Sequence, residues 1–172
     1  KVSDRKVRDE WKPLWGKRAV VEDHFNELVI DLVNPAGQPE RMQLVVRGYN
    51  DGFAFCYKIP DGKGPCVNVQ SELTAYNFAG DYTAWFYNGE NHNIGPEKLT
   101  ETDGTRLPVM TVKAGDKHYM AIHEACLETG APLVLQSKGG NRSFRSLPSR
   151  PVCRRDIHQP GVSFCMGRYL AC

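Results

Sequence analysis

Alternating hydrophobic and polar positions stand out in the stretch VMTVKAGDKHYMAIHEACL, which occupies residues 109–127. The pattern predicts two strands joined by a tight turn around Gly115, because glycine readily adopts the positive φ that such turns need. In the second strand, Met120 and Ile122 share one face, and His123 lies on the other. We therefore interpret this stretch as a β-hairpin.

Three earlier segments predict an antiparallel meander. Residues 22–33 alternate so that Leu28 lies on one face and Glu27 on the other, which is typical of a half-buried strand. Residues 41–49 form a second strand, and an Asn-Asp-Gly turn leads into a third strand over residues 53–59. Aromatic side chains recur at every second position of the third strand, so they share one of its faces.

Short strands are also expected in the rest of the chain. Runs of β-branched, aromatic or alternating residues lie at 71–78, 82–87, 131–137 and 143–147. With the hairpin and the meander, the sequence predicts eight or nine strands, and a helical period never persists for three turns. The expected fold class is all-β, with two packed antiparallel sheets.

A polar loop is expected at residues 88–97, because NGENHNIGPE is rich in turn-forming residues. Glu90, Asn91 and His92 lie close together in it. Such a loop is either a surface connection or the rim of a binding site, since binding residues often lie on loops. These three residues are our candidates for substrate binding.

The end of the chain reads differently from the rest. From residue 148 onwards the sequence is rich in arginine and cysteine and has no clear period. We expect a sandwich domain over residues 1–150 and an irregular tail or truncated linker over residues 151–172. The cysteine and histidine spacings of the tail match no recognised zinc site.

The composition is that of an ordinary globular domain, with 172 residues, of which 41% are hydrophobic and 24% charged. The net charge of +2 is too small to indicate nucleic acid or an acidic membrane surface as a partner. The sequence has no apolar run of about 18 residues, so no transmembrane helix is expected. The chain starts at Lys1 without an apolar signal segment, which we interpret as a processed product or a fragment.

Glu124 is the first residue to consider for function, because it stands beside His123 at the end of an apolar strand. A carboxylate placed there loses hydration, so it should be exposed or hold a partner. The simpler alternative is a solvated glutamate at a strand exit. The sequence contains no nucleophile motif and no phosphate-binding glycine-rich loop. The residues alone do not single out two of the 20 acidic side chains for glycoside hydrolysis.

Seven stretches together resemble a known family. They are WKPLWG (residues 11–16), DHFNEL (23–28), RGYNDGFAF (47–55), ELT (72–74), GDYTAW (80–85), ENHNIGPE (90–97) and AIHEA (121–125). In this order they resemble the N-terminal domain of glycoside hydrolase family 97, which comprises bacterial α-glucosidases and α-galactosidases. The resemblance covers roughly residues 9–150.

The resemblance implies an antiparallel β-super-sandwich of the galactose-mutarotase-like kind. In the family this sandwich packs against a (β/α)8 barrel that carries the catalytic carboxylates, and this chain lacks the barrel. The family domain begins several strands before the position of Lys1, so the sandwich is expected to be incomplete at its N-terminal end. A periplasmic or secreted location is a further expectation from the family.

The resemblance also implies a role for Glu124. By motif, Glu124 matches the glutamate that the sandwich domain donates to a calcium ion in the active site. Calcium takes about six to eight oxygen ligands, so the missing barrel would have to supply the others. We therefore expect this chain by itself to bind calcium poorly and to hydrolyse nothing. The expected partners are the barrel of the same polypeptide and an oligosaccharide substrate.

Two other interpretations remain open. The chain could be a stand-alone carbohydrate-binding module that uses Trp11, Trp15, Trp85 and Tyr87 as stacking platforms. It could also be a purely structural or interaction domain. The position of Glu124 relative to these aromatic side chains separates the three interpretations.

Overall fold

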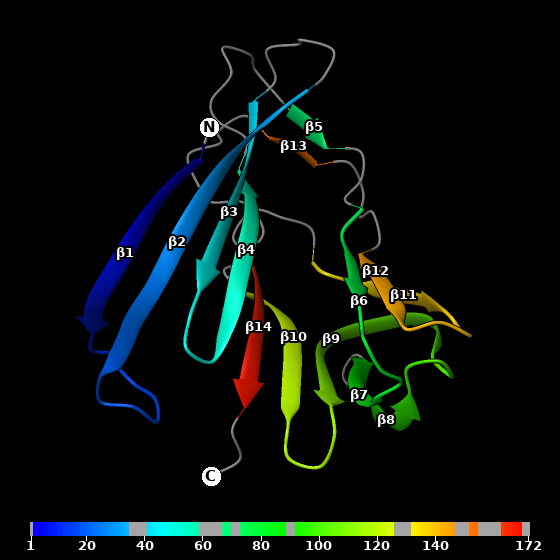
Figure 1. The fold of residues 1–172 in the computed structure, drawn as a ribbon. Helices are drawn as coiled ribbons and strands as arrows, with labels where there is room; N and C mark the ends of the chain where they lie inside the picture. Colours follow the sequence, from blue (N-terminus) through cyan, green and yellow to red (C-terminus); the bar gives the residue numbers. More distant parts are fainter. Residues whose placement is uncertain are drawn as a thin grey trace.

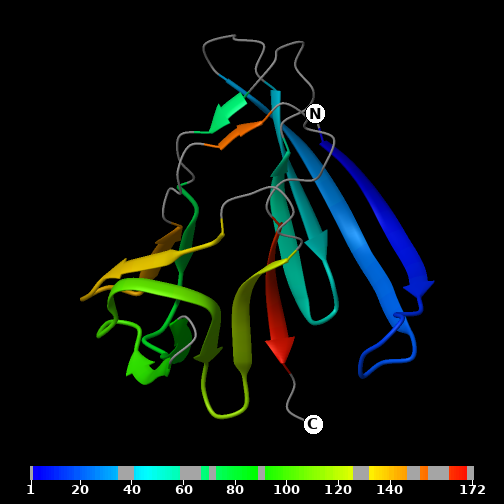
Figure 2. The ribbon, with the colours of Figure 1, turned by 180° about the vertical axis from the view of Figure 1, so that it is seen from behind.

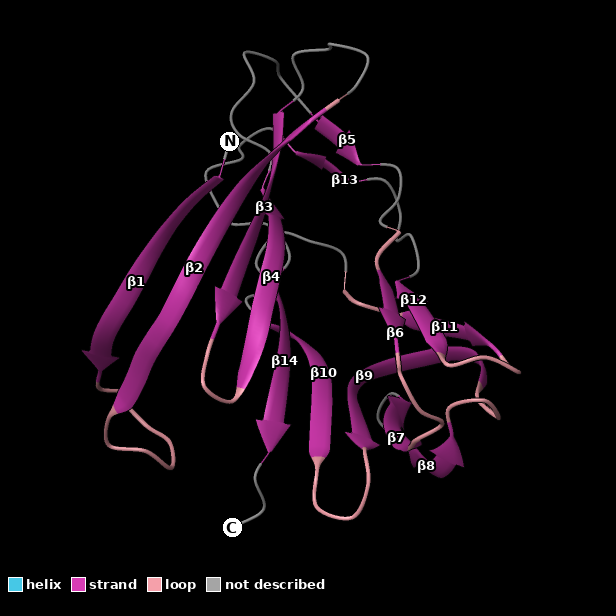
Figure 3. Ribbon diagram, in the orientation of Figure 1, coloured by secondary structure: helices cyan, strands magenta, loops and turns pink. Residues whose placement is uncertain are grey.

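The structure, a computed structural model, is built of β-strands. The residues it describes are 2–34, 41–58, 67–69, 73–88, 92–125, 132–146, 152–154 and 163–169. Within these ranges the chain forms strands and connections without a helix (Figures 1 and 3). In the same ranges, no helix of the length and hydrophobicity needed to span a membrane is found. The predicted all-β fold class is confirmed.

The strands are numbered in chain order. They are β1 (Val2–Trp11), β2 (Val21–Val33), β3 (Arg41–Gly48), β4 (Gly52–Lys58), β5 (Val67–Val69), β6 (Ala75–Asn77), β7 (Thr83–Asn88), β8 (His92–Lys98), β9 (Asp103–Lys113), β10 (Tyr119–Ala125), β11 (Leu135–Lys138), β12 (Ser143–Ser146), β13 (Val152–Arg154) and β14 (Ser163–Tyr169).

The paired strands are antiparallel throughout the described part of the chain. One hydrogen-bonded series runs β1-β2-β3-β4-β14-β10-β9-β11-β12-β6, and β7 pairs with both β8 and β9. β13 and β5 form a separate pair. The predicted meander is present as β2-β3-β4. The predicted hairpin is β9-β10, and Gly115 in its turn has a φ of 79°.

β9 carries the series from one layer of the sandwich into the other. Its residues 103–106 pair with β11, whereas its residues 110–113 pair with β10. Figure 1 shows β9 curving from the side of β11 and β12 toward β10, and Figure 2 shows the same bend from behind. A strand that bends in this way forms a corner of a β-sandwich, because it belongs to both sheets.

The hydrophobic core lies where the two layers face each other. It consists of buried side chains from β6, β7, β9, β10, β11, β12 and the neighbouring connections: Tyr76, Phe78, Ala84, Phe86, Leu99, Met110, Val112, Ile122, Leu133, Leu135 and Phe144. Because these strands alternate, their other faces carry more polar and more exposed residues.

The meander buries a charged group as well as an aromatic one. Phe25 and Glu27 are 3% and 6% exposed on one face of β2, whereas Leu28 on the opposite face is 37% exposed. The Nε atoms of Arg5 and Arg47 donate hydrogen bonds of 2.6 and 2.8 Å to the two carboxylate oxygens of Glu27. The alternation of β2 is as predicted, but its more deeply buried face holds a paired carboxylate.

β1 and β8 are polar strands that lie where the hydrophobic pattern predicts none. β1 covers a mostly charged and exposed segment, and β8 covers most of the expected loop at residues 88–97. Both are held by backbone pairing along a neighbouring strand, β2 for β1 and β7 for β8. Polar residues on an edge strand leave no alternation to detect, because little of the strand is buried.

The segment expected to be an irregular tail contributes two strands. β13 pairs with β5, and β14 lies between β4 and β10, so it joins the meander to the hairpin. The partners of β14 come from distant parts of the chain, which is why no local pattern predicts the strand. The domain boundary at residue 150 stays a prediction.

Candidate functional site

Glu124 lies at the end of β10, one residue before the strand stops. Its Oε2 atom accepts a hydrogen bond of 3.0 Å from the backbone N–H of Leu133. Its Oε1 atom is buried and has no hydrogen-bond partner among the residues that the structure describes. The carboxylate is therefore oriented by one oxygen, and the other oxygen is available to a partner.

The environment of Glu124 is unfavourable for a bare negative charge. Desolvation by burial raises the pKa of this carboxyl, and the hydrogen bond from Leu133 lowers it by a smaller amount. Neither cause involves a charged side chain. A buried carboxylate that lacks a cationic neighbour favours protonation or the binding of a cation.

The side chain of Glu124 lies on the core-facing side of β10. It follows Ile122 by two positions, and Ile122 is 1% exposed within the core. His123, on the opposite face, places its Nδ1 atom 3.1 Å from the backbone carbonyl oxygen of Glu124. In the described ranges, no group of three or more His, Cys, Asp or Glu residues is placed to hold a metal ion. Glu124 could thus contribute one ligand to a metal site and not a complete site.

The three candidates for substrate binding belong to the β7-β8 hairpin. Glu90 and Asn91 lie outside the described residues, and His92 begins β8, where it pairs with Asn88. β7 and β10 both pair with residues 111–113 of β9, one on each side. Both strands are antiparallel to β9, so from there they run toward its N-terminal part. The described ends of β7 and β8, Asn88 and His92, therefore lie toward the same end of this part of the sandwich as the Glu124 end of β10.

An open groove of about 610 Å³ adjoins this hairpin. Aromatic, aliphatic and neutral polar residues from β7, β8 and β9 line it: Trp85, Phe86, Tyr87, Asn93, Pro108, Val109 and Thr111. Of these, sequence reasoning singled out only the two aromatic residues Trp85 and Tyr87. Phe86 lies between them on β7, and the remaining residues come from β8 and β9, which no local signal connects with β7.

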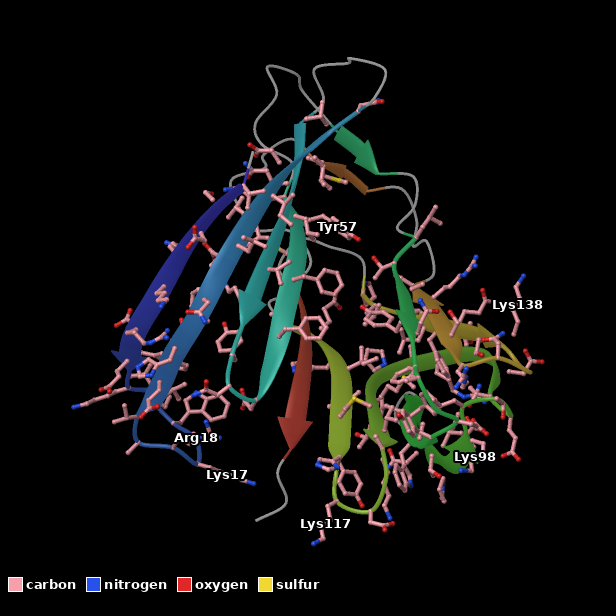
Figure 4. The ribbon with its side chains drawn as sticks, in the orientation of Figure 1. Lys17, Arg18, Tyr57, Lys98, Lys117 and Lys138 are labelled. Carbon is pink, nitrogen blue, oxygen red and sulfur yellow. The ribbon has the colours of Figure 1, made fainter. Side chains whose placement is uncertain are left out.

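The four aromatic residues considered as sugar platforms do not form one surface. Trp11 and Trp15 are 54% and 88% exposed at the end of β1 and in the connection to β2. β1 and β7 lie on opposite sides of the molecule in both ribbon views (Figures 1 and 2). Figure 4 likewise places Lys17 of the β1-β2 connection far from Lys98 of β8. Of the four, Trp85 and Tyr87 line the groove described above.

The fold and this site are those of an antiparallel β-sandwich with a lone, oriented carboxylate at a strand end. A family model described as "Glycosyl-hydrolase 97 N-terminal" matches residues 1–152. The chain therefore belongs to the N-terminal domain family of glycoside hydrolase family 97, as the sequence motifs indicated.

Curated relatives are glycosidases. The chain is 31% identical over 124 residues to a probable retaining alpha-galactosidase of Streptomyces bingchenggensis, covering 71% of this chain and 16% of the relative. It is 29% identical over 159 residues to a retaining alpha-galactosidase of Bacteroides thetaiotaomicron, covering 81% of this chain and 23% of the relative. The chain thus spans less than a quarter of the length of these relatives, in which the domain is part of a larger polypeptide.

Solved structures share the fold. A glycoside hydrolase family 97 enzyme from Pseudoalteromonas sp. strain K8, in complex with acarbose, has a TM-score of 0.81 at 23% identity. The match covers 97% of this chain and 27% of that enzyme. A beta-arabinopyranosidase structure has the same TM-score at 15% identity, with 97% of this chain and 31% of the other covered.

Proposed function

We propose that this chain is the non-catalytic N-terminal domain of a calcium-dependent glycoside hydrolase, in which Glu124 donates a carboxylate oxygen to the active-site calcium ion. The observation that carries the proposal is the buried Oε1 atom of Glu124, which has no hydrogen-bond partner in the described part of the chain. Burying a hydrogen-bond acceptor without a partner costs free energy. A ligand that pairs with Oε1 recovers that free energy, which favours its binding.

The chemistry of Glu124 fits calcium. Calcium is a hard cation that prefers carboxylate and carbonyl oxygens, and it needs about six to eight of them. The N–H of Leu133 fixes Oε2 and so holds Oε1 in one orientation. A barrel domain elsewhere in the polypeptide would supply the remaining ligands. When bound, the ion would orient water or the sugar and lower the cost of crowding carboxylates together.

The relatives suggest the substrate class. Two are named alpha-galactosidases, and structures of the Pseudoalteromonas enzyme contain acarbose or panose. We propose α-galactosides or α-glucosides as substrates of the whole polypeptide. Glu90, Asn91 and His92 would contact the sugar from the β7-β8 connection. A periplasmic or secreted location belongs to the same proposal.

The test is hydrolysis of p-nitrophenyl α-glucoside and α-galactoside by the full polypeptide that contains this chain. The wild type is compared with Glu124→Ala and Glu124→Gln, each with and without a chelator. We expect both substitutions and the chelator to lower kcat/KM by about 100-fold or more, because a ligand should matter at least as much as the residues that orient ligands. Glu22→Gln is the matched control, since the side chain of Glu22 is 70% exposed.

Two results would contradict the proposal. Full activity of Glu124→Ala would show that Glu124 is a charge at a strand end with no role in the active site. Activity that persists after thorough chelation would show that the reaction does not require calcium. Calcium binding by calorimetry separates the two parts of the proposal, because loss of the ligand should weaken binding even under conditions where turnover is slow.

A further inference from the structure

The groove beside β7 exists because the sheet is irregular on both sides of this strand. Between Trp85 and Tyr87, β7 advances by two positions while its partner β9 advances from Thr111 to Leu107, by four positions. On the other side, β8 also carries an extra residue opposite β7. Bulges of this kind re-aim side chains and often lie next to functional sites.

The irregular pairing leaves apolar side chains in solvent. Tyr87 is 44% exposed and Val109 is 49% exposed, whereas Phe86 between the two aromatic residues is 2% exposed and belongs to the core. The ring of Trp85 packs against that of Tyr119, with 6.5 Å between centroids and 35° between planes. Trp85 is therefore held in position by a neighbour.

The lining of the groove selects the kind of ligand. The amide of Asn93 and the hydroxyl of Thr111 are its hydrogen-bonding side chains apart from the aromatic residues, and its described lining contains no charged residue. Such a surface offers flat apolar rings with a few neutral donors and acceptors. A neutral sugar matches it, because a sugar ring has an apolar C–H face and a rim of hydroxyl groups.

The groove and the Glu124 carboxylate lie on opposite faces of the sheet. Trp85 pairs with Thr111, and Thr111 pairs with Ala121, so these residues share a face. Ile122 and Glu124 lie on the other face of β10. A sugar bound against Trp85 would therefore not occupy the position of a ligand bound to Glu124.

We propose that this groove is an oligosaccharide-binding site, in which a sugar ring stacks on Trp85 and Tyr87 and its hydroxyl groups bond to Asn93 and Thr111. The proposal rests on the proposed function only for the class of sugar, namely a neutral α-glycoside.

The experiment uses the fluorescence of Trp85 in this chain. The sequence contains three tryptophans, so Trp11→Phe and Trp15→Phe leave Trp85 as the only one. This double variant is titrated with panose, an α-glucoside, and with raffinose, an α-galactoside. We expect a saturable change in intensity or wavelength with at least one sugar, and circular dichroism verifies the fold of each variant.

Two substitutions in the groove then test its geometry. Tyr87→Ala removes a stacking surface and Val109→Arg places a long side chain across the groove. Both positions are nearly half exposed, at 44% and 49%, so neither change should unfold the domain. We expect each to weaken sugar binding by about fivefold or more, Tyr87→Ala through the loss of an aromatic contact and Val109→Arg through obstruction of the groove. Phe53→Ala is the matched control, because Phe53 is a 41% exposed aromatic residue outside the groove.

Three results would overturn the proposal. They are the absence of a saturable change with both sugars, binding that is unaffected by Tyr87→Ala and Val109→Arg, and binding that is weakened equally by Phe53→Ala. Glu124→Gln is added to distinguish the groove from the Glu124 site experimentally. Sugar binding that survives Glu124→Gln supports the groove whatever the hydrolysis assay gives, and loss of hydrolysis in Glu124→Ala says nothing about the groove.

Discussion

The same apolar face of the sheet is buried in one half of the molecule and partly exposed in the other. In the half formed by β6, β7 and β9 to β12, that face holds Ile122 at 1% exposure and Phe144 at 0%. In the half formed by β1 to β4, it holds Leu28 at 37% and Phe53 at 41%. We call these the covered half and the open half.

The pairing register shows that the face is continuous. Phe53 of β4 pairs with Met166 of β14, and Met166 pairs with Ile122 of β10, so the three positions share one side of the sheet. Alternation therefore identifies which residues can face a core. Whether they are buried depends on a second layer, which β6, β11 and β12 provide only over the covered half. The stability of the domain should be concentrated there.

The largest expected effect comes from a matched pair of phenylalanine truncations. Phe144→Ala in the covered half should cost about 3–5 kcal/mol of unfolding free energy, because it leaves a cavity among buried side chains. Phe53→Ala in the open half should cost about 1 kcal/mol, since much of its ring is already in water. Denaturant unfolding of both variants measures the difference. Equal costs would show that the two halves are covered alike.

The buried charge of the open half is expected to matter less than a core phenylalanine and more than an exposed one. Glu27→Gln should cost about 1–3 kcal/mol, because hydrogen bonds from Arg5 and Arg47 to a carboxylate would be weakened at a site that is 6% exposed. Glu22→Gln, on the same strand and exposed, is the control and should be nearly neutral.

The pH dependence of Glu27 sharpens this prediction. The hydrogen bond from Arg5 is the largest cause that lowers the pKa of Glu27, and the bond from Arg47 adds to it against desolvation. The stabilisation is therefore fully present above the ordinary pKa of a glutamate and is lost as the pH falls through the lowered value. The difference in unfolding free energy between wild type and Glu27→Gln should shrink on acidification. A difference that grows instead would contradict the ion pair.

The smallest expected effect has the opposite sign. Glu124→Gln should stabilise the metal-free chain near neutral pH by less than about 1 kcal/mol, because the carboxylate is partly buried without a cationic partner among the described residues and solvent screens part of the cost. Its pKa is raised by desolvation, so the cost exists above the raised value and disappears below the ordinary one. Thermal unfolding at about pH 7 and about pH 3.5 measures this, and a destabilised variant at neutral pH would refute it.

Local patterns were enough for the parts of the fold that are formed by neighbours in sequence. The β9-β10 hairpin with its turn at Gly115 and the β2-β3-β4 meander follow from alternation and turn residues. β1 and β8 were missed because polar edge strands do not alternate. β14 was missed because its partners, β4 and β10, are far away in the chain.

The candidate site divides in the same way. Glu124 could be chosen from the sequence, since a charge at the end of an apolar strand is conspicuous, but the contact of Oε2 with Leu133 and the buried state of Oε1 could not. The aromatic residues Trp85 and Tyr87 were visible, whereas Asn93 and Thr111 joined them only through the pairing of β7 with β8 and β9.

The sequence by itself determined the all-β class, the family and the strand that presents Glu124, because alternation, turn residues and ordered motifs are local properties of the chain. Only the tertiary structure decided which apolar face is covered, that Glu27 is buried between Arg5 and Arg47, and where the groove opens. These features depend on contacts between residues distant in sequence. The free energy that stabilises them comes from burial and pairing between these distant residues, and a local sequence pattern does not reveal such contacts.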